Sequence, residues 1–198
     1  MTRISAVLIA AGVSTRMGRP KPLLTWHGVT LLEYQVGALV EGGADEVVVV
    51  LGHGAEDLTA YVKGESVRYV VNADYRQGKT TSIKAGVGSI DPEAEAILLL
   101  AVDQPRTAQI ISVVVQAHRE GHRLITSPRY HGRGGHPLIF AASLRGELEA
   151  ITEEKQGIRE VLEAHRHEVA LVPLDDPMVR LDLNTPEAYE EAKQLYGA

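Results

Sequence analysis

The chain lacks cysteine, is poor in aromatic residues and has no long apolar run. Without a single Cys among its 198 residues, disulfides, cysteine-ligated zinc and thiol catalysis are all excluded. Aromatic residues make up only 5%, so we expect an aliphatic core. No apolar run approaches the roughly 20 residues that span a bilayer, and the N-terminus lacks the pattern of a signal peptide. We therefore expect a cytoplasmic protein without a membrane partner.

Positive charge is also scarce. The formal net charge is -6 and the isoelectric point is about 5.8, whereas nucleic-acid-binding domains are usually basic. We therefore expect no nucleic-acid partner, and any local cluster of cations becomes more informative. Apolar residues at 44% and charged residues at 23% are typical of a globular protein. The length suits one domain spanning residues 1–198.

Short runs rich in Val, Ile and Leu recur along the first two-thirds of the chain, at residues 6–10, 47–51, 67–71, 96–102 and 124–126. Such nearly continuous runs are typical of strands buried on both faces, and so of a mostly parallel sheet. Helical spacing of apolar residues appears between them, at residues 31–40, 80–87 and 107–118. This alternation predicts a doubly wound, Rossmann-like α/β fold in three α/β/α layers.

The last third of the chain is less regular. We expect helices over residues 144–151 and 158–165 and a strand over residues 168–173. A final helix should begin at Pro186 and run to about Tyr196, with Asn184 or Thr185 as its N-cap. Because ligands of such folds bind beyond the carboxyl ends of the strands, we expect functional residues in the loops that follow strands.

The loop after the first predicted strand, residues 10–21, reads AAGVSTRMGRPK. Its glycines permit tight turns and exposed N–H groups, and Ser14 and Thr15 add hydroxyl donors. Three cations follow within six residues, namely Arg16, Arg19 and Lys21. A polyphosphate needs backbone donors, close approach and fixed positive charge. The alternative is a glycine-rich surface turn with solvated basic residues.

Two common phosphate-binding patterns are absent from the chain. The loop at residues 10–21 lacks the GxxxxGK[ST] spacing of a Walker A sequence, and it is not GxGxxG. The Gly78-Lys79-Thr80 triplet also fails as a Walker A sequence, because Ala73 stands where the first glycine should be.

The loop resembles the signature A-A-G-x-S-x-R-M-G-x-x-K of the nucleotidyltransferase superfamily that includes the molybdenum cofactor cytidylyl- and guanylyltransferases. The resemblance implies a Mg²⁺-dependent transfer of a nucleotidyl group, with Arg16 and Lys21 as catalytic residues. It also implies that the nucleotide is bound by Ala10, Ala11, Gly12, Ser14 and Gly18.

Residues 72–83, NADYRQGKTTSI, resemble the second loop of this family, which contacts base and ribose. The resemblance adds Gly78 and Ser82 to the nucleotide-binding residues. A polar loop and helix N-terminus can offer amide donors to a base edge. The alternative is that Thr80 or Ser82 is merely the N-cap of a helix.

Asp103 follows the apolar run at residues 96–102 directly. A carboxylate at the end of a buried strand is costly to desolvate unless something compensates, and a Mg²⁺-triphosphate would do so. The alternative is that Asp103 caps the helix that begins near Thr107, although a spacing of four makes this awkward. In the family resembled, Asp-Gln-Pro at this place supplies the metal ligand, which makes Asp103 both a catalytic and a metal-binding candidate.

Two later segments complete the resemblance. Residues 130–137, YHGRGGHP, resemble the G-x-x-G-H-P element of the cytidylyltransferase branch, which makes His136 a candidate acceptor-binding residue. Residues 181–187, LDLNTPE, resemble D-I-D-T-P-E-D, which makes Asp182 a candidate second metal ligand. Here the sequence departs from the family, because Asn184 and Ala188 replace two aspartates, and Asn184 could simply cap the final helix.

The implied reaction is CTP plus molybdenum cofactor (molybdopterin) giving the cytosine dinucleotide form and pyrophosphate, with possible delivery of the product to a molybdoenzyme. The Ala10-Ala11-Gly12 start and the Gly-His-Pro element resemble the cytidylyl branch more than the guanylyl branch. Three alternatives stay open: a GTP-using relative, a sugar-phosphate nucleotidyltransferase, and a nucleotide-binding accessory protein without catalysis.

Overall fold

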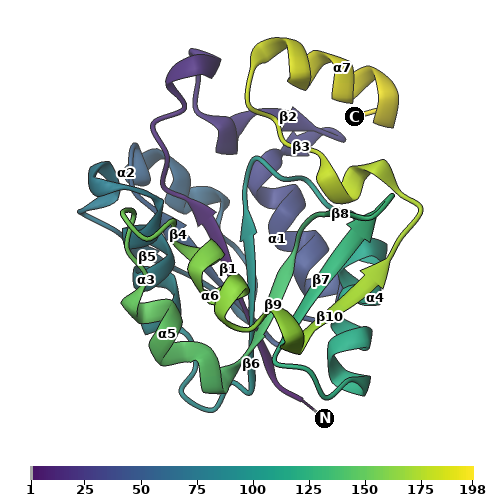
Figure 1. The fold of residues 1–198 in the computed structure, drawn as a ribbon. Helices are drawn as coiled ribbons and strands as arrows, with labels where there is room; N and C mark the ends of the chain where they lie inside the picture. The colour runs from purple at the N-terminus through teal and green to yellow at the C-terminus, as the bar shows by residue number, and fades with distance from the viewer. Residues whose placement is uncertain (1) are drawn as a thin grey trace.

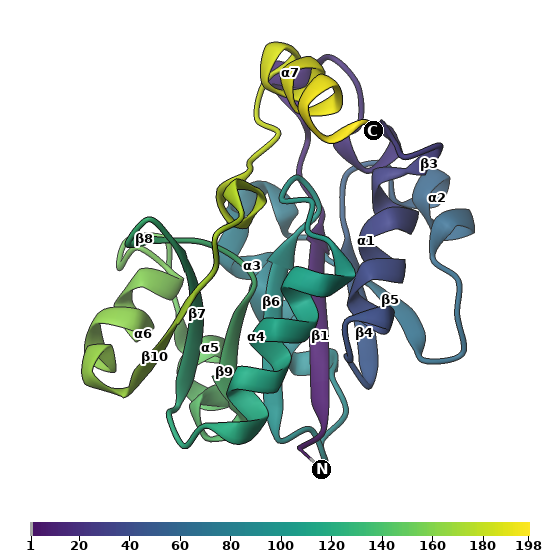
Figure 2. The same cartoon turned by 90° about the vertical axis from the view of Figure 1, so that its right-hand side faces the viewer.

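The computed structural model describes residues 2–198, and all but two of its strands form one central sheet with helices on both faces (Figures 1 and 2). The sheet order is β10-β7-β9-β6-β1-β4-β5, with β8 paired to β7. The strands of this sheet are β1 (Ile4–Ala10), β4 (Glu46–Leu51), β5 (Val67–Val71), β6 (Ala96–Ala101), β7 (Ile125–Tyr130), β8 (Arg133–Gly134), β9 (Leu138–Ala141) and β10 (Val169–Pro173).

Most neighbouring strands are parallel, as the runs of Val, Ile and Leu predict. β1 pairs in parallel with β4 and β6, β4 with β5, and β7 with β10, whereas β9 is antiparallel to both β6 and β7. The short strand β9 was not expected from the sequence. A separate two-stranded ribbon is formed by β2 (Thr25–Trp26) and β3 (Val29–Thr30).

The helices form the two outer layers of the fold. Figure 2 shows α1 and α4 on one face of the sheet, and α3, α5 and α6 on the other. The helices are α1 (Leu31–Glu41), α2 (Ala55–Leu58), α3 (Lys79–Ser89), α4 (Ala108–Glu120), α5 (Arg145–Ala150), α6 (Ile158–Ala164) and α7 (Pro186–Tyr196). The predicted three-layer α/β/α architecture is therefore confirmed. No helix within residues 2–198 combines the length and apolar content that crossing a membrane requires.

Alternating residues of the central strands divide the core into two halves. In β1, Ile4, Ala6 and Leu8 pack with α1 and α4, whereas Val7 and Ile9 pack with α3, α5 and α6. This follows from the period of two along a strand, which points successive side chains to opposite faces. Both faces of β1 are buried, so its carboxyl end is held rigidly between the two helix layers.

The prediction that every apolar run is buried on both faces is wrong for β5. Tyr69 is 48% exposed and Val71 is 51% exposed, because β5 is the edge strand of the sheet and lacks full cover. The expected N-cap of the last helix is resolved in favour of Thr185, whose hydroxyl accepts a hydrogen bond from the amide of Ala188 at 3.2 Å.

Candidate functional site

A cavity of about 310 Å³ lies at the carboxyl ends of β1 and β6. It collects residues from four distant parts of the chain: the loop after β1, the segment that leads into α3, the loop after β6 and the segment before α7. Nine of the residues expected at a nucleotide site line it, namely Ala10, Ala11, Gly12, Ser14, Arg16, Lys21, Gly78, Ser82 and Asp103. We call this site the small cavity.

The most strongly held charges in the small cavity are Lys21 and Asp103. Lys21 Nζ lies 2.7 Å from Asp103 Oδ2 and donates a second hydrogen bond to Asn184 Oδ1 at 3.1 Å. Both side chains are largely buried, at 12% exposure for Lys21 and 25% for Asp103. A carboxylate and an ammonium paired at this depth interact more strongly than a surface pair would.

Asp103 is not the cap of the following helix. Thr107 is the N-cap of α4, since its hydroxyl accepts a hydrogen bond from the amide of Ile110 at 3.2 Å. The backbone carbonyl of Asp103 accepts a hydrogen bond from Leu183 N–H at 2.8 Å. This bond ties the C-terminal segment to the loop after β6 and brings Asn184 to Lys21.

The loop after β1 reaches its shape by a different route from the one expected. Ser14 and Gly18 adopt left-handed backbone conformations, with φ of 57° and 66°, whereas Gly12 does not. A Cβ at Gly12 would meet nothing within 4 Å, so the space beside it is open to a ligand. The hydroxyl of Ser14 accepts a hydrogen bond from the amide of Lys21 at 3.1 Å and so closes the loop.

The loop places its three cations differently. Arg16 and Lys21 line the small cavity, whereas Arg19 lies outside it, 4.0 Å from Glu190 and over the ring of Tyr189. With Lys79, the small cavity holds three cations against the single carboxylate of Asp103, in a chain whose net charge is -6. This excess of positive charge suits a polyphosphate.

The start of α3 forms another wall of the small cavity. Its N-cap is Gly78, at φ 130°, and no side chain caps the helix from this position. Glu153 does so from the segment between α5 and α6, accepting a hydrogen bond from Thr80 N–H at 2.7 Å. Ser82 lies inside the helix, where its hydroxyl accepts from Asn72 Nδ2 at 3.0 Å. Neither Thr80 nor Ser82 is therefore the N-cap.

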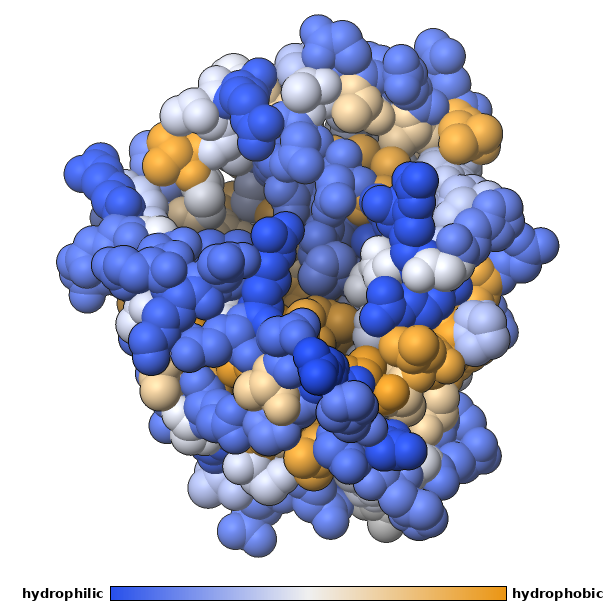
Figure 3. All heavy atoms as spheres, viewed as in Figure 1, coloured by the Kyte–Doolittle hydropathy of each residue, from blue (hydrophilic) through white to orange (hydrophobic). Residues whose placement is uncertain are grey.

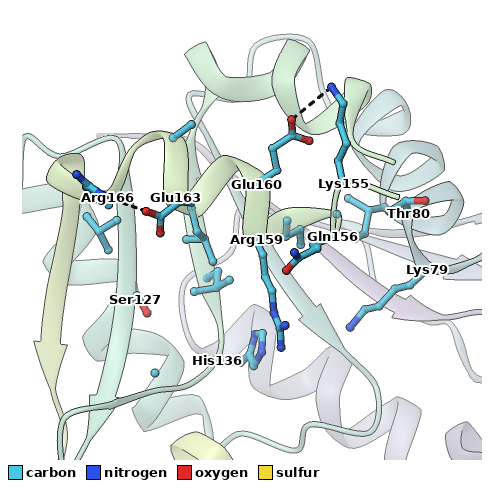
Figure 4. A pocket seen from close by; sticks show the side chains of 18 of the residues that line it. Lys79, Thr80, Ser127, His136, Lys155, Gln156, Arg159, Glu160, Glu163 and Arg166 are labelled. Atoms are coloured by element: carbon cyan, nitrogen blue, oxygen red, sulfur yellow. Dashed lines mark hydrogen bonds and ion pairs between the residues drawn. The ribbon is translucent and has the colours of Figure 1, made fainter. Parts of the chain in front are cut away.

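A second, larger cavity of about 1260 Å³ adjoins the small one, and Lys79 lines both. It lies over the β7 and β10 side of the sheet, against α6 (Figure 4). The face drawn in Figure 3 is hollowed near its middle, with hydrophilic residues around the hollow and hydrophobic ones below it. His136, the predicted acceptor-binding residue, lines this large cavity and not the small one.

His136 is neutral at physiological pH. Burial first, and then the charges of Arg106 and Lys79, lower its pKa to about 3 against an opposing effect of Asp103. A neutral imidazole offers one N–H donor and one acceptor. His136 can therefore orient a polar group by hydrogen bonding, and it cannot supply positive charge.

Arg106 is buried and connects segments that line the two cavities. Its side chain is fully buried and donates to four backbone carbonyls at 2.7–3.0 Å. Those carbonyls belong to Pro105, His136, Val179 and Leu181. Burial lowers the pKa of Arg106 to about 10, so the guanidinium stays charged. One side chain thus connects the loop after β6, the His136 segment and the C-terminal segment.

Only one of the two candidate metal ligands lines the small cavity. Asp103 lines the small cavity, but Asp182 does not, and its carboxylate accepts a hydrogen bond from Gln104 Nε2 at 2.8 Å. Asn184 lines the cavity in its place. Within residues 2–198 no group of three His, Cys, Asp or Glu residues could hold a metal. Mg²⁺ commonly takes one or two carboxylates and completes its shell with phosphates and water, so Asp103 fits a metal brought by a triphosphate.

Several lining residues were not expected from the sequence. Tyr75 and Lys79 line the small cavity, and Arg129 and Arg159 line the large one. Tyr75 and Lys79 lie inside the NADYRQGKTTSI segment, where an aromatic ring and a cation beside a glycine could have been noticed. Arg129 and Arg159 carry no local signal, since only the fold brings β7 and α6 together. Gly18, predicted to bind nucleotide, shapes the loop but does not line either cavity.

The chain is similar to known proteins over almost its whole length. It is 33% identical to the nicotine blue oxidoreductase of Paenarthrobacter nicotinovorans, over 93% of each chain. It is 27% identical to the molybdenum cofactor cytidylyltransferase of Escherichia coli (strain K12), over 99% of this chain and 98% of that protein.

A solved structure has the same fold and was obtained with a metal. The manganese complex of Rv0371c from Mycobacterium tuberculosis H37Rv superposes with a TM-score of 0.79 at 27% identity, covering 96% of this chain and 97% of that one. The model of the family described as MobA-like NTP transferase domain matches residues 6–169. The chain therefore belongs to the family of MobA-like NTP transferase domains.

Proposed function

We propose that the protein transfers CMP from CTP to the phosphate of molybdopterin, with release of pyrophosphate. The observation that carries this proposal is the Lys21–Asp103 pair, which lies at 2.7 Å in a cavity lined by the phosphate-type loop after β1. A metal-binding carboxylate and a phosphate-neutralising cation are the two groups that nucleotidyl transfer demands most.

In the proposed reaction an acceptor phosphate oxygen forms a bond to the α-phosphorus of the nucleotide. The bond from the α-phosphorus to the bridging oxygen breaks, and pyrophosphate leaves with the electron pair. A phosphate monoester is largely ionised near neutral pH, since its second pKa is about 6. No general base is therefore required, and catalysis consists of alignment and charge neutralisation.

The proposed roles of the residues follow from their positions. Asp103 would hold Mg²⁺, which when bound neutralises phosphate charge. Arg16 and Lys21 would offset charge on the transferred phosphate and on pyrophosphate. The backbone beside Gly12 is open to the triphosphate, and Ser82 lies in the same cavity. Lys21 would exchange its bond to Asp103 for one to phosphate as the metal binds.

Asn184 replaces Asp182 in our proposal for the second polar group near the metal. It faces Lys21 at 3.1 Å, whereas Asp182 accepts from Gln104 outside the cavity. An amide oxygen is a neutral ligand, so a site built from Asp103 and Asn184 has one negative charge fewer than a pair of carboxylates.

The choice of CTP and molybdopterin is supported by the Ala10-Ala11-Gly12 start, the Gly-His-Pro element at His136 and the cytidylyltransferase of E. coli among the relatives. His136 lines a separate large cavity beside the nucleotide site, where an acceptor could lie. A cytoplasmic location and delivery of the product to a molybdoenzyme belong to the same proposal.

The test is a thermal-shift panel of CTP, GTP, ATP and UTP, each with and without Mg²⁺. A ligand at 100 times its Kd should stabilise the protein by about 2.7 kcal/mol, enough for a shift of several degrees. We expect a Mg²⁺-dependent shift selective for CTP that is lost in Asp103→Ala. A preference for GTP would overturn the choice of base, and no shift with any nucleotide would overturn the proposal.

A second candidate function is an oxidoreductase activity, favoured by the 33% identity to nicotine blue oxidoreductase over 93% of both chains. Its test is whether the protein catalyses electron transfer between nicotine blue and an added two-electron donor or acceptor, followed by the absorbance of nicotine blue. Turnover there, with no pyrophosphate released from any nucleotide, would replace the transferase proposal.

A further inference from the structure

Apart from Glu153, whose carboxylate accepts a hydrogen bond from Thr80 N–H at the start of α3, the charged residues that line the large cavity fall into two sets. The first set is paired. Lys155 lies 3.5 Å from Glu160, and Arg166 lies 3.1 Å from Glu163. Both pairs are drawn in Figure 4, away from His136. Their charges cancel locally, so these residues give the cavity no net attraction for an anion.

The second set is not paired. Lys79, Arg129 and Arg159 line the cavity, and in the part of the chain from residue 2 to 198 no carboxylate lies within ion-pair distance of any of them. The Nε atom of Arg129 is buried and has no hydrogen-bond partner. A buried donor without a partner costs free energy. Three cations outside any ion pair, against the one carboxylate of Glu153, give the cavity an excess of positive charge.

Two of the unpaired cations, Lys79 and Arg159, face a common space. Figure 4 shows the side chains of Lys79, from the start of α3, and Arg159, from α6, both directed toward the space beside His136. The imidazole there is neutral, for the reasons given above, so it can donate a hydrogen bond to an anion without adding charge. The arrangement offers charged donors and one neutral donor to a single anionic group.

The cavity also has an apolar side. Its aliphatic lining residues are Ile83, Leu138, Ile158, Leu162, Val169 and Leu171. Leu171 is 58% exposed, although it lies on a strand beside this cavity. A ligand that combines an anionic group with an apolar or aromatic body would cover this surface and gain hydrophobic free energy.

We infer that Lys79, Arg129 and Arg159 bind the phosphate of an organic phosphate monoester whose apolar body lies on the aliphatic side of the large cavity. The inference rests on the proposed function in one respect, namely that this ligand is the acceptor. Lys79 lines both cavities, so a phosphate held by it lies where the two cavities meet. That is the position an acceptor needs in order to attack a nucleotide in the small cavity.

A phosphate bound by these cations could also come from the nucleotide or from released pyrophosphate, because Lys79 lines both cavities. A variant of Arg159 distinguishes the two ligands, since Arg159 lines the large cavity only. If the cluster serves the acceptor, replacing Arg159 weakens a phosphate monoester and leaves Mg²⁺-CTP unchanged. If it serves the nucleotide, the same replacement weakens Mg²⁺-CTP.

The experiment uses the full chain and 1-naphthyl phosphate as the probe, with 1-naphthol and inorganic phosphate for comparison. Binding is followed by ¹⁵N NMR of the arginine Nε–H groups and by naphthyl fluorescence. The variants are Arg159→Ala and Arg159→Gln. Arg166→Ala is the matched control, because Arg166 lines the same cavity but is paired to Glu163. Thermal unfolding verifies that each variant is folded.

We expect 1-naphthyl phosphate to bind the wild type more tightly than either comparison compound and to shift Arg159 and Arg129 Nε–H resonances. Loss of one charged hydrogen bond, about 1.5–3 kcal/mol, should raise the Kd of both Arg159 variants roughly 10- to 100-fold. The Arg166→Ala variant should stay within about 2-fold, since an exposed pair contributes little.

Three results would overturn the inference. The first is no binding of 1-naphthyl phosphate at a concentration on the order of 10 mM. The second is that Arg159→Ala binds 1-naphthyl phosphate as tightly as the wild type does, and the third is that Arg159→Ala loses affinity for Mg²⁺-CTP. Failure of the proposed function is a separate outcome. If CTP does not bind but 1-naphthyl phosphate does, the phosphate site stands and the transferase proposal falls.

Discussion

The two adjoining cavities are built in opposite ways. The small one is formed by contiguous segments that follow strands, and its central contact joins Lys21 to Asp103 at 2.7 Å. The large one is lined by residues of α3, β7, α6, β10 and the segment before β9, and within residues 2–198 three of its cations form no ion pair. In the small cavity the cation Lys21 is paired with a carboxylate of the protein. In the large cavity the charge of Lys79, Arg129 and Arg159 would be neutralised by an anionic ligand.

Arg106 connects the segments that line the two cavities, because its buried side chain donates hydrogen bonds to four carbonyls in those parts of the chain. Arg106→Met should lower the free energy of unfolding by about 3–5 kcal/mol, since four buried carbonyls lose their donor. Chemical denaturation measures this. The control is Arg119→Met, which removes donors to only two carbonyls, both part-buried, and an ion pair with Asp45 at 3.2 Å. A cost no greater than that of the control would show that the two cavities do not depend on Arg106.

Lys21 tests the small cavity. Lys21→Ala should lower kcat for pyrophosphate release roughly 10²- to 10³-fold, the usual effect of removing one electrostatic stabiliser. The comparison is Arg19→Ala in the same loop, because Arg19 is 58% exposed and pairs only with Glu190 at 4.0 Å. A change of only a few-fold in folded Lys21→Ala would remove Lys21 from the chemistry.

Gly86 tests how rigidly α3 carries its residues to both cavities. A Cβ at Gly86 would collide with the side chains of Val7 and Val50, whereas one at Gly88 would meet nothing within 4 Å. Gly86→Ala should destabilise the protein by about 1–3 kcal/mol through overpacking. Gly88→Ala should instead stabilise it by about 0.5–1 kcal/mol, the difference in helix propensity. Equal effects in thermal unfolding would mean that α3 is not packed tightly against β1 and β4.

His136 tests the large cavity through pH. Because burial, with the charges of Arg106 and Lys79, lowers its pKa to about 3, the unfolded chain binds the proton more readily. His136 therefore contributes stability above its unfolded pKa of about 6.5, and this is lost as pH falls from about 6.5 toward 3. The expected slope is up to about 1.4 kcal/mol per pH unit.

The measurement for His136 is the difference in unfolding free energy between wild type and His136→Gln, from pH 7 to pH 4. His118, whose pKa is also lowered by burial, is present in both proteins, so its effect cancels. The wild type should lose more stability than the variant over this range. Parallel curves would mean that His136 titrates normally in the folded protein.

The sequence predicts the fold and the small cavity better than the large one. Runs such as residues 47–51 and 96–102 identify buried strands, and the loop after β1 brings its own residues together. β9 is missed because four residues are too few to separate a strand from a loop by periodicity. Its antiparallel insertion between β6 and β7 is also not a local property.

Residues that act across the fold were the hardest to predict. The pairing of Asn184 with Lys21, in place of Asp182, depends on how the C-terminal segment is tied to the backbone of Asp103. Arg159 lies on a short helix whose sequence carries no functional pattern, and only the packing of α6 over the sheet brings it to His136. The left-handed Ser14 likewise takes a conformation that the sequence suggested for a glycine.

The most direct test of the account is pyrophosphate release from CTP with Mg²⁺ and molybdopterin, with the nucleotide product identified by mass spectrometry. We expect pyrophosphate in equal amount to a cytidylylated molybdopterin, with neither product from Asp103→Ala. CTP binding without pyrophosphate release under any of these conditions would contradict it, and would leave the protein as a nucleotide-binding accessory.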